Sequence, residues 1–377
     1  MPARTENDGG LPLFQTAIKQ ASGGIPVIVS DTPVPNVTPG TALVRVAAVG
    51  LNPTDYKMPT NFPTAGATVG CDFAGTIVSI KQDKEGGELD SDGLCRLLRL
   101  GDRVCGAVHG SNPANKDEGS FAEYVLTPTS MLIRIPDSVR WEQAAALGGV
   151  GHGTVAQALW SCMRLQHSPD SPASEDTSVA VLVYGGSTAT GTMAMQLLRM
   201  SGLKPIAVCS TRSFAIARQY GAAAVFDYRS PSCGADIRAY TGNSLFYALD
   251  CISDKRSVEI CYKALGRAGG KYVCLESQPQ EAFAQRRAVR PEFLMAYDMF
   301  GKGIELPGDY GRAPNLGRYE LGQRWSRTFQ TLLEENKISF HPIKILSGKW
   351  DGILAGLDLL RKGQVSGTKL VVHVSSK

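Results

Sequence analysis

The sequence predicts a two-domain α/β protein in which a module of β-strands is joined to a doubly wound parallel sheet. The chain has 377 residues, which at roughly 150 residues per domain is too long for one small module. Its first third contains short apolar runs separated by turn residues, a pattern typical of β-strands. From Val179 onward, strands, a glycine-rich turn and helices alternate, as expected for parallel strands connected by helices.

The β module is predicted from four strands, at residues 42–51, 71–80, 102–108 and 120–126. Charges and glycines at residues 81–99 indicate an exposed loop, and a helix is expected to begin near Trp141. The chain returns to strands from about His341, and we expect this tail to rejoin the first module. The expected domains are residues 1–160 and 161–335, with residues 336–377 as the C-terminal return.

The composition excludes several classes of function. With 39 basic and 35 acidic residues, the net charge of +4 is too small for a nucleic-acid-binding surface. The nine cysteines are an odd number without C-x2-C spacing, which favours a reducing compartment. The N-terminus does not resemble an export signal, and the uncharged stretches are interrupted by polar residues and glycines. We therefore expect a soluble, cytoplasmic protein that binds neither nucleic acid nor membrane.

The strongest motif is VYGGSTATG at residues 183–191, between an apolar strand and a helix. Small residues at such a junction allow the backbone to approach a pyrophosphate, and the start of the helix favours its negative charge. Hydroxyl donors are available from Ser187, Thr188 and Thr190. The alternative is a tight turn that needs small residues for packing alone.

The end of the next strand distinguishes between the two nicotinamide cofactors. An NAD site usually has a carboxylate there that binds the ribose 2′-hydroxyl, but this strand runs into Ser210, Thr211, Arg212 and Ser213. Hydroxyl groups and a guanidinium group suit a 2′-phosphate instead. The sequence therefore favours NADPH, although Arg212 taken alone could be an ordinary surface arginine.

Several segments together resemble the trans-acting enoyl reductases of fungal polyketide clusters, a zinc-independent branch of the medium-chain dehydrogenase/reductases. They are NPTDYK near the front, VLVYGGSTATGTMAMQLLRMSG, FDYR, YALDCI, GRAGGKYV and RKGQVSGTKLVV. The resemblance implies a GroES-like β domain flanking a central Rossmann domain. It also implies NADPH-dependent reduction of the α,β double bond of a polyketide intermediate by a monomeric enzyme. The intermediate would be held on the acyl carrier protein of a separate polyketide synthase or of a hybrid of a polyketide synthase and a nonribosomal peptide synthetase (PKS-NRPS).

The resemblance also implies the residues of the site. Lys57 is the implied catalytic residue. The implied cofactor contacts are Asn52, Pro53, Thr54, Asp55, Ser187, Thr188, Ala189, Thr190, Ser210, Thr211, Arg212, Ser213, Tyr228, Leu275, Glu276, Ser366 and Gly367. The implied substrate contacts are Leu147, Gly148, Gly149, Val150, Gly151, His152, Gly153, Thr154, Tyr297, Asp298, Met299, Phe300 and Gly301.

Lys57 closes NPTDYK, which we expect to form a loop after a strand. Conjugate reduction develops negative charge on the thioester oxygen and needs a proton at the α carbon, and an ammonium group can serve either need. The alternative is a type I turn with Pro53 at its second position and a solvated lysine. Asp55 and Tyr56 remain rival polar groups.

No metal is expected. A catalytic zinc needs Cys, His and acid ligands with one open position, but NPTDYK has no cysteine where alcohol dehydrogenases have their first ligand. The five histidines do not have the spacing of metal ligands, and no Gly-His-Glu occurs. A metal-free hydride transfer follows.

The substrate region departs from the family pattern, because Gly153 stands where a threonine is expected and Thr154 follows one place later. A basic cluster of Arg286, Arg287 and Arg290 suits either an acidic carrier protein or a solvated helix face. Two other functions remain open: a stand-alone quinone or enone reductase, and a non-catalytic NADPH-binding partner of the synthase.

Overall fold

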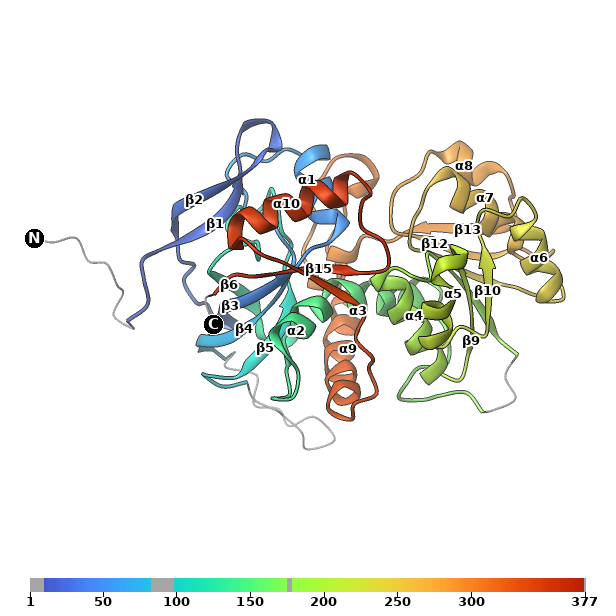
Figure 1. Ribbon diagram of the computed structural model, residues 1–377, viewed down its shortest axis with the longest axis horizontal. Coiled ribbons are helices and arrows are strands. Elements are labelled where there is room, and N and C mark those ends of the chain that lie inside the picture. The colour runs from blue at the N-terminus through green and yellow to red at the C-terminus, as the bar shows by residue number, and fades with distance from the viewer. Residues whose placement is uncertain (1–9, 83–97, 175–177, 376–377) are drawn as a thin grey trace, which may run out of the picture. The chain divides into compact units, whose positions relative to one another are not determined.

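The computed structural model describes residues 10–82, 98–174 and 178–375 (Figure 1). These residues form two compact units: unit 1 lies within Met1–Val150 and Phe329–Lys377, and unit 2 within Gly151–Thr328. The loop expected at residues 81–99 falls mostly outside the described ranges. Among the described residues, no helix is both long enough and apolar enough to cross a bilayer.

Unit 1 is built on a seven-stranded sheet with the order β14-β15-β3-β4-β5-β7, in which β6 also pairs with β3. The strands of this sheet are β3 (Thr41–Gly50), β4 (Asp72–Lys81), β5 (Arg103–Ala107), β6 (Tyr124–Pro128), β7 (Ile133–Arg134), β14 (Ile343–Leu346) and β15 (Lys369–His373). A separate hairpin consists of β1 (Phe14–Gln20) and β2 (Pro26–Pro33). Because β15 pairs antiparallel with β3, the C-terminal tail belongs to the same sheet as the first strands.

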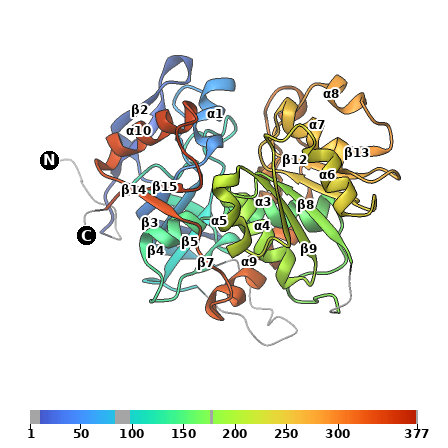
Figure 2. The same ribbon diagram turned by 45° about the vertical axis from the view of Figure 1, so that its right-hand side comes forward.

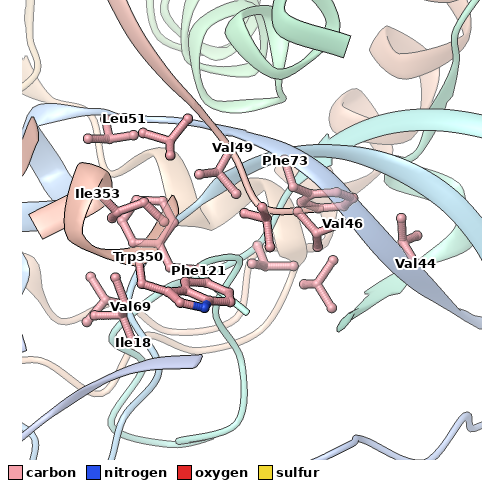
Figure 3. Close-up of a cluster of buried hydrophobic side chains, with 14 of the residues drawn as sticks. Ile18, Val44, Val46, Val49, Leu51, Val69, Phe73, Phe121, Trp350 and Ile353 are labelled. Carbon is pink, nitrogen blue, oxygen red and sulfur yellow. The ribbon is translucent and has the colours of Figure 1, made fainter. Parts of the chain in front are cut away.

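Buried apolar residues of β3 contribute to the core of unit 1. Val44, Val46 and Val49 are almost fully buried, and Figure 3 shows them with Phe73 of β4 and with Trp350 of α10 (Lys349–Arg361). The core therefore joins residues from both ends of the chain.

One feature of unit 1 was not predicted and one expectation was wrong. The β1–β2 hairpin was missed, and NPTDYK is not a loop: α1 (Pro53–Asn61) begins there. Pro53 occupies the first turn of this helix, where a missing N–H costs nothing, and the Asn52 backbone N–H donates to Asp55 Oδ2 at 2.7 Å. Unit 1 also contains α2 (Trp141–Leu147), which starts where a helix was expected.

Unit 2 contains a six-stranded parallel sheet with the order β10-β9-β8-β11-β12-β13 (Figure 2). Its strands are β8 (Ala180–Tyr184), β9 (Lys204–Cys209), β10 (Ala224–Asp227), β11 (Tyr247–Asp250), β12 (Gly270–Cys274) and β13 (Val289–Phe293). Its helices include α3 (Val150–Ala156), α4 (Ala189–Met200), α5 (Phe214–Gln219), α6 (Cys233–Tyr240), α7 (Lys255–Ala264) and α8 (Gln280–Ala284), and the unit boundary falls within α9 (Leu316–Glu334).

The strand order reverses at β8. From there the chain builds β9 and β10 on one side, and then returns to place β11 on the other side of β8. In doubly wound sheets, ligands bind at the carboxyl ends of the strands beside such a reversal. The predicted fold class, a β domain plus a doubly wound parallel sheet, is confirmed.

Candidate active site

The turn after β8 is built from residues that leave its backbone open. Gly185 has a φ of +79°, which favours glycine, and a Cβ on Gly191 would lie 2.3 Å from the Gly185 carbonyl oxygen. Thr188 caps α4: its hydroxyl donates to the Gly185 carbonyl at 2.8 Å and accepts from the Gly191 N–H at 3.0 Å. The Thr188 hydroxyl is therefore used to shape the turn.

Ser187, Ala189 and Thr190 are half-buried in the same turn. They lie at the start of a helix of 12 residues, where N–H groups without intrahelical partners and the helix dipole favour an anion. These residues fit the pyrophosphate of a dinucleotide.

The carboxyl ends of β9 and β10 lie side by side, because Cys209 pairs with Asp227 in the parallel register. This register brings together Ser210 and Tyr228, the residues that follow. The hydroxyl oxygens of Ser210 and Ser213 are 3.2 Å apart, and Thr211 and Arg212 are exposed.

Two arginines that sequence reasoning missed flank Tyr228. The guanidinium carbons of Arg229 and Arg256 lie 5.3 Å and 5.5 Å from the centre of its ring. Arg256 lies in α7, 28 positions after Tyr228, so only the fold brings the two together. With Arg212, three guanidinium groups belong to the segments at this end of the sheet.

A buried carboxylate, Asp250, organises the other side of the strand reversal. It accepts from the backbone N–H groups of Ile252 (2.9 Å) and Ser253 (2.8 Å) and from the hydroxyls of Ser257 (2.5 Å) and Tyr272 (2.7 Å). Burial raises the pKa of Asp250, and these hydrogen bonds oppose that rise. Sequence reasoning missed this role, although an acid at the end of YALD was a visible signal.

The Asp250 turn also places the predicted residues after β12. The Ser253 hydroxyl accepts from the Leu275 N–H at 2.8 Å, and Glu276 accepts a hydrogen bond from the Tyr310 hydroxyl. Leu275 and Glu276 therefore lie at the same edge of the sheet as the turn after β8, since Asp250 pairs with both Tyr184 and Cys274.

Unit 1 carries the other predicted residues. In α1, Pro53 is exposed, Asp55 is buried, and Thr54 and Lys57 are half-buried. Tyr56 packs against the apolar core of unit 1, so it is a weaker candidate than Lys57 for the catalytic residue.

One carboxylate, Asp72 at the start of β4, connects three segments of unit 1. Its Oδ1 accepts from the backbone N–H groups of Gly149 and Val150 at 2.8 and 2.9 Å. Its Oδ2 accepts from Asn52 Nδ2 at 2.8 Å and from Lys369 Nζ at 2.5 Å. Lys369 Nζ also donates to Asn52 Oδ1 at 2.8 Å, so the start of α1, the substrate segment and β15 share one buried network.

Three further predicted residues lie next to this network: Gly148, Ser366 and Gly367. Gly148 follows the buried Leu147 at the end of α2 and has a φ of +47°, and a Cβ there would lie 2.2 Å from the Asp72 carboxylate. The predicted cofactor residues Ser366 and Gly367 directly precede Thr368 and Lys369. Sequence reasoning missed both Asp72 and Lys369.

Asp55 is buried beside this network, and desolvation raises its pKa to about 7. Hydrogen bonds from the Asn52 backbone and the Cys71 thiol lower the pKa, and the neighbouring Asp72 raises it. Among the described residues, Asp55 Oδ1 has no hydrogen-bond partner, so the ionised form is poorly compensated.

In unit 2, the remaining substrate residues are mostly buried. His152 Nδ1 accepts from Trp325 Nε1 at 3.1 Å, which is typical of a packing histidine. A Cβ on Gly153 would lie 2.8 Å from Met299 Cε, so glycine replaces threonine where Met299 fills the space. In the same segment, Gly151 is half-buried and Thr154 is buried.

The second substrate segment, residues 297–301, is held by polar contacts at its back. Asp298 is buried and pairs with Arg318 at 2.5 Å, while the side chains of Tyr297, Met299 and Phe300 are at most 9% exposed. Gly301, with a φ of +71°, ends the 3-10 turn. Asp298 therefore anchors the segment to Arg318, and Met299 and Phe300 are buried apolar side chains of the segment.

Within the described ranges, no three His, Cys, Asp or Glu side chains gather in a way that could hold a metal ion.

The structure separates the three arginines that were grouped from the sequence, Arg286, Arg287 and Arg290. Arg286 donates to the carbonyls of Tyr262 and Leu265 at 2.9 and 2.8 Å at the end of α7, whereas Arg287 and Arg290 are exposed.

Comparisons with known proteins agree with this architecture. Residues 38–137 match the alcohol dehydrogenase GroES-like domain, and residues 189–297 match the zinc-binding dehydrogenase family. The chain is 44% identical to a trans-enoyl reductase of Aspergillus flavipes over 99% of both proteins, and 45% identical to one of Aspergillus niger over 97% of this chain and 98% of that protein. The solved CurK enoyl reductase has the same fold, with a TM-score of 0.68, 16% identity, and coverage of 95% of this chain and 99% of that one. The chain therefore belongs to the trans-enoyl reductases, within the medium-chain dehydrogenase/reductases.

Proposed function

We propose that this chain uses NADPH to reduce the α,β double bond of a polyketide intermediate, which a separate synthase carries on its acyl carrier protein. The reaction class is supported by the membership of the trans-enoyl reductases. The observation that carries the choice of cofactor is the end of β9, where Ser210, Thr211, exposed Arg212 and Ser213 stand without a carboxylate. Arg229 and Arg256 beside Tyr228 add positive charge for a 2′-phosphate.

When bound, NADPH supplies the hydride that adds to the β carbon. The chain supplies binding and charge. The turn from Gly185 to Thr188 holds the pyrophosphate at the start of α4, and Asp250 keeps the neighbouring turn in place. Lys57 on α1 provides the positive charge that stabilises the thioester oxygen, and the proton for the α carbon.

The position of Lys57 depends on residues that do not react. Asn52 fixes the start of α1 through Asp72 and Lys369, and the same Asp72 carboxylate holds the Gly149–Val150 backbone. The helix that carries Lys57 and the proposed substrate segment are thus set by one anchor, which is the arrangement expected where positioning decides the rate.

The test is consumption of NADPH by the purified protein with an α-methyl enoyl thioester of N-acetylcysteamine, compared with a small quinone. We expect reduction of the thioester, a strong preference for NADPH over NADH, and no effect of EDTA. Reduction of the quinone alone would identify a stand-alone quinone reductase. Tight NADPH binding with turnover of neither substrate would identify a non-catalytic partner. We further propose that the protein acts in the cytoplasm, because its nine cysteines without C-x2-C spacing favour a reducing compartment, and that it acts as a monomer, as the family resemblance implies.

A further inference from the structure

Unit 2 contains a cavity of about 740 Å³ that shares no residue with the proposed cofactor site. Its walls come from the end of the π-helical segment Gln157–Cys162, from β12 and β13, and from the first turns of α9. The charged residues that line it are Arg164, Lys271, Arg290, Arg318, Arg324 and Glu292. We call this cavity the arginine groove.

Internal contacts already occupy two of the five basic groups. Lys271 Nζ donates to the carbonyl of Met163 at 2.8 Å. Arg318 pairs with Glu292 at 2.6 Å and with Asp298 at 2.5 Å. The groove's single acidic residue is therefore already paired, and it does not neutralise the remaining arginines.

Arg164, Arg290 and Arg324 are exposed, and none of them has a hydrogen-bond or ion-pair partner within the described part of the chain. They come from three segments far apart in the sequence, so the fold gathers these charges around one concave surface. Three uncompensated guanidinium groups attract carboxylates or phosphates, to which they bind in a bidentate manner.

The strand beside the groove restricts the kind of partner. β13 is the last strand of its sheet, but Pro291 in its middle has no N–H to donate, which opposes the addition of another strand. We therefore expect a partner to bind here through the charged side chains of the groove and not through the backbone of β13. Arg318 also joins the groove to the substrate segment, because the same guanidinium that lines the groove binds Asp298.

We propose that the arginine groove docks an acidic surface of the synthase's acyl carrier protein. This inference rests on the proposed function, which requires a carrier to meet the reductase, and on charge complementarity, since carrier proteins are acidic. It also corrects the earlier grouping of basic residues: Arg290 belongs to the groove, whereas Arg286 caps α7.

The test compares one enoyl group on two supports: α-methylcrotonyl phosphopantetheine on a recombinant carrier domain of a fungal polyketide synthase, and α-methylcrotonyl N-acetylcysteamine. The variant is the triple charge reversal Arg164→Glu, Arg290→Glu and Arg324→Glu. The matched control is Lys263→Glu, an exposed basic residue of α7 that lines a different cavity. Binding of the fluorescently labelled carrier domain to the reductase, with the reductase saturated with NADPH, is measured separately by fluorescence anisotropy.

For the triple variant we expect kcat/KM on the carrier-bound substrate to fall by about tenfold or more. The kcat/KM on the free thioester should stay within about twofold, and carrier affinity should lose most of its dependence on salt. Lys263→Glu should leave kcat/KM unchanged on both substrates. Unchanged kcat/KM and unchanged carrier binding in the triple variant would overturn the proposal, and so would an equal loss on both substrates. If the wild-type protein reduces neither substrate, the proposed enoyl reductase activity fails, while the anisotropy measurement still decides whether the groove binds the carrier.

Discussion

Lys369 and Asp72 form an ion pair that is closed to solvent: Nζ and Oδ2 are 2.5 Å apart, and the two side chains are 4% and 0% exposed. Lys369 begins β15 and Asp72 begins β4, and β3 lies between these strands in the sheet. The pair therefore crosses the end of β3, where Asn52 begins the helix that carries Lys57. An ion pair at this position connects the C-terminal tail to the proposed catalytic helix.

The first prediction concerns this pair. Lys369→Met should lower the free energy of unfolding by about 3–5 kcal/mol, because the Asp72 charge would remain buried without its counter-ion. The double variant Asp72→Asn with Lys369→Met should recover a large part of that loss, because neither charge remains. Urea unfolding of the wild type, the single variant and the double variant measures both effects. A single variant as stable as the wild type would show that Asp72 does not depend on Lys369.

Activity separates positioning from stability in the same variants. We expect the double variant to regain stability but not the wild-type kcat, because it no longer has the Asp72 carboxylate that holds Asn52 and the Gly149–Val150 backbone. Recovery of kcat together with stability would limit the pair to a structural role.

The fold class was predictable from the sequence because several elements carry their own local signal. β8 is a continuous apolar run, and α4 follows a glycine-rich turn. The start of α1 was misread because a Pro after Asn suits either a turn or the first position of a helix. The hydrogen bond from the Asn52 N–H to Asp55, which distinguishes the two, is formed only in the folded chain.

The site was predictable where strand ends carry the chemistry, because the carboxyl ends of parallel strands meet at one edge. Ser210 and Tyr228 follow residues that pair in the sheet. Contacts between distant segments were not predictable: Lys369 and Asp72 are 297 positions apart, and no local pattern marks either residue as a partner of the other. The same holds for Arg256 beside Tyr228.

The second prediction tests the choice of cofactor. Arg212→Ala should weaken NADPH binding by about 1.5–3 kcal/mol, the range for a hydrogen bond to a charged group, and should leave NADH binding nearly unchanged. Titration with each cofactor gives the two dissociation constants. Arg218→Ala is the matched control, because Arg218 is an exposed arginine on α5 whose guanidinium lies over Phe214. Equal affinities of the wild-type protein for the two cofactors would contradict the assignment.

The third prediction concerns the dependence of stability on pH. Burial raises the pKa of Asp55 from 3.8 to about 7 in the folded protein, so between these values the folded state binds a proton that the unfolded state releases. The stability from this site is therefore fully present below about pH 4 and is lost as the pH rises through 7. Asp55→Asn, which keeps an oxygen for the Asn52 N–H, should remove this contribution.

Urea unfolding at several pH values between 4 and 8 checks the prediction for Asp55. The wild-type free energy of unfolding should contain a component that decreases across this range, by at most about 1.4 kcal/mol per pH unit, and the Asp55→Asn profile should lack it. Parallel profiles for the two proteins would show that Asp55 does not titrate there.

The fourth prediction addresses the departure at Gly153. Gly153→Thr should destabilise the protein by about 1 kcal/mol, the low end of the range for added core volume. Its Cβ would meet Met299 Cε at 2.8 Å and Sδ at 2.9 Å, and these atoms end a flexible side chain that can shift. Combining Gly153→Thr with Met299→Ala, which shortens the side chain that the threonine would meet, should relieve the clash. The double variant should then lose less stability than the sum of the two single variants. Thermal unfolding of the four proteins measures the coupling. Strictly additive effects would mean that the two side chains do not meet.

The last prediction concerns Lys57. Lys57→Ala should lower the turnover of an enoyl thioester by roughly 10² to 10³, the range for loss of a general acid or of an electrostatic contact in the transition state. NADPH affinity should change by no more than a few fold, because the residues proposed to hold the cofactor's phosphates lie in unit 2. Tyr56→Phe is the matched control: Tyr56 neighbours Lys57 but packs against the apolar core, so loss of its hydroxyl should leave turnover near the wild-type value.

Steady-state rates and NADPH titration of the two variants separate the possible roles of Lys57. A Lys57→Ala enzyme that keeps more than about a tenth of wild-type turnover would remove Lys57 from the chemistry. If NADPH binding weakened by orders of magnitude while turnover at saturation stayed intact, Lys57 would be a cofactor contact, and the proton would have to come from another side chain or from water. If Tyr56→Phe lost as much turnover as Lys57→Ala, the phenol would have to act in the reaction despite its packing in the core, and α1 would have to present that side chain to the substrate instead.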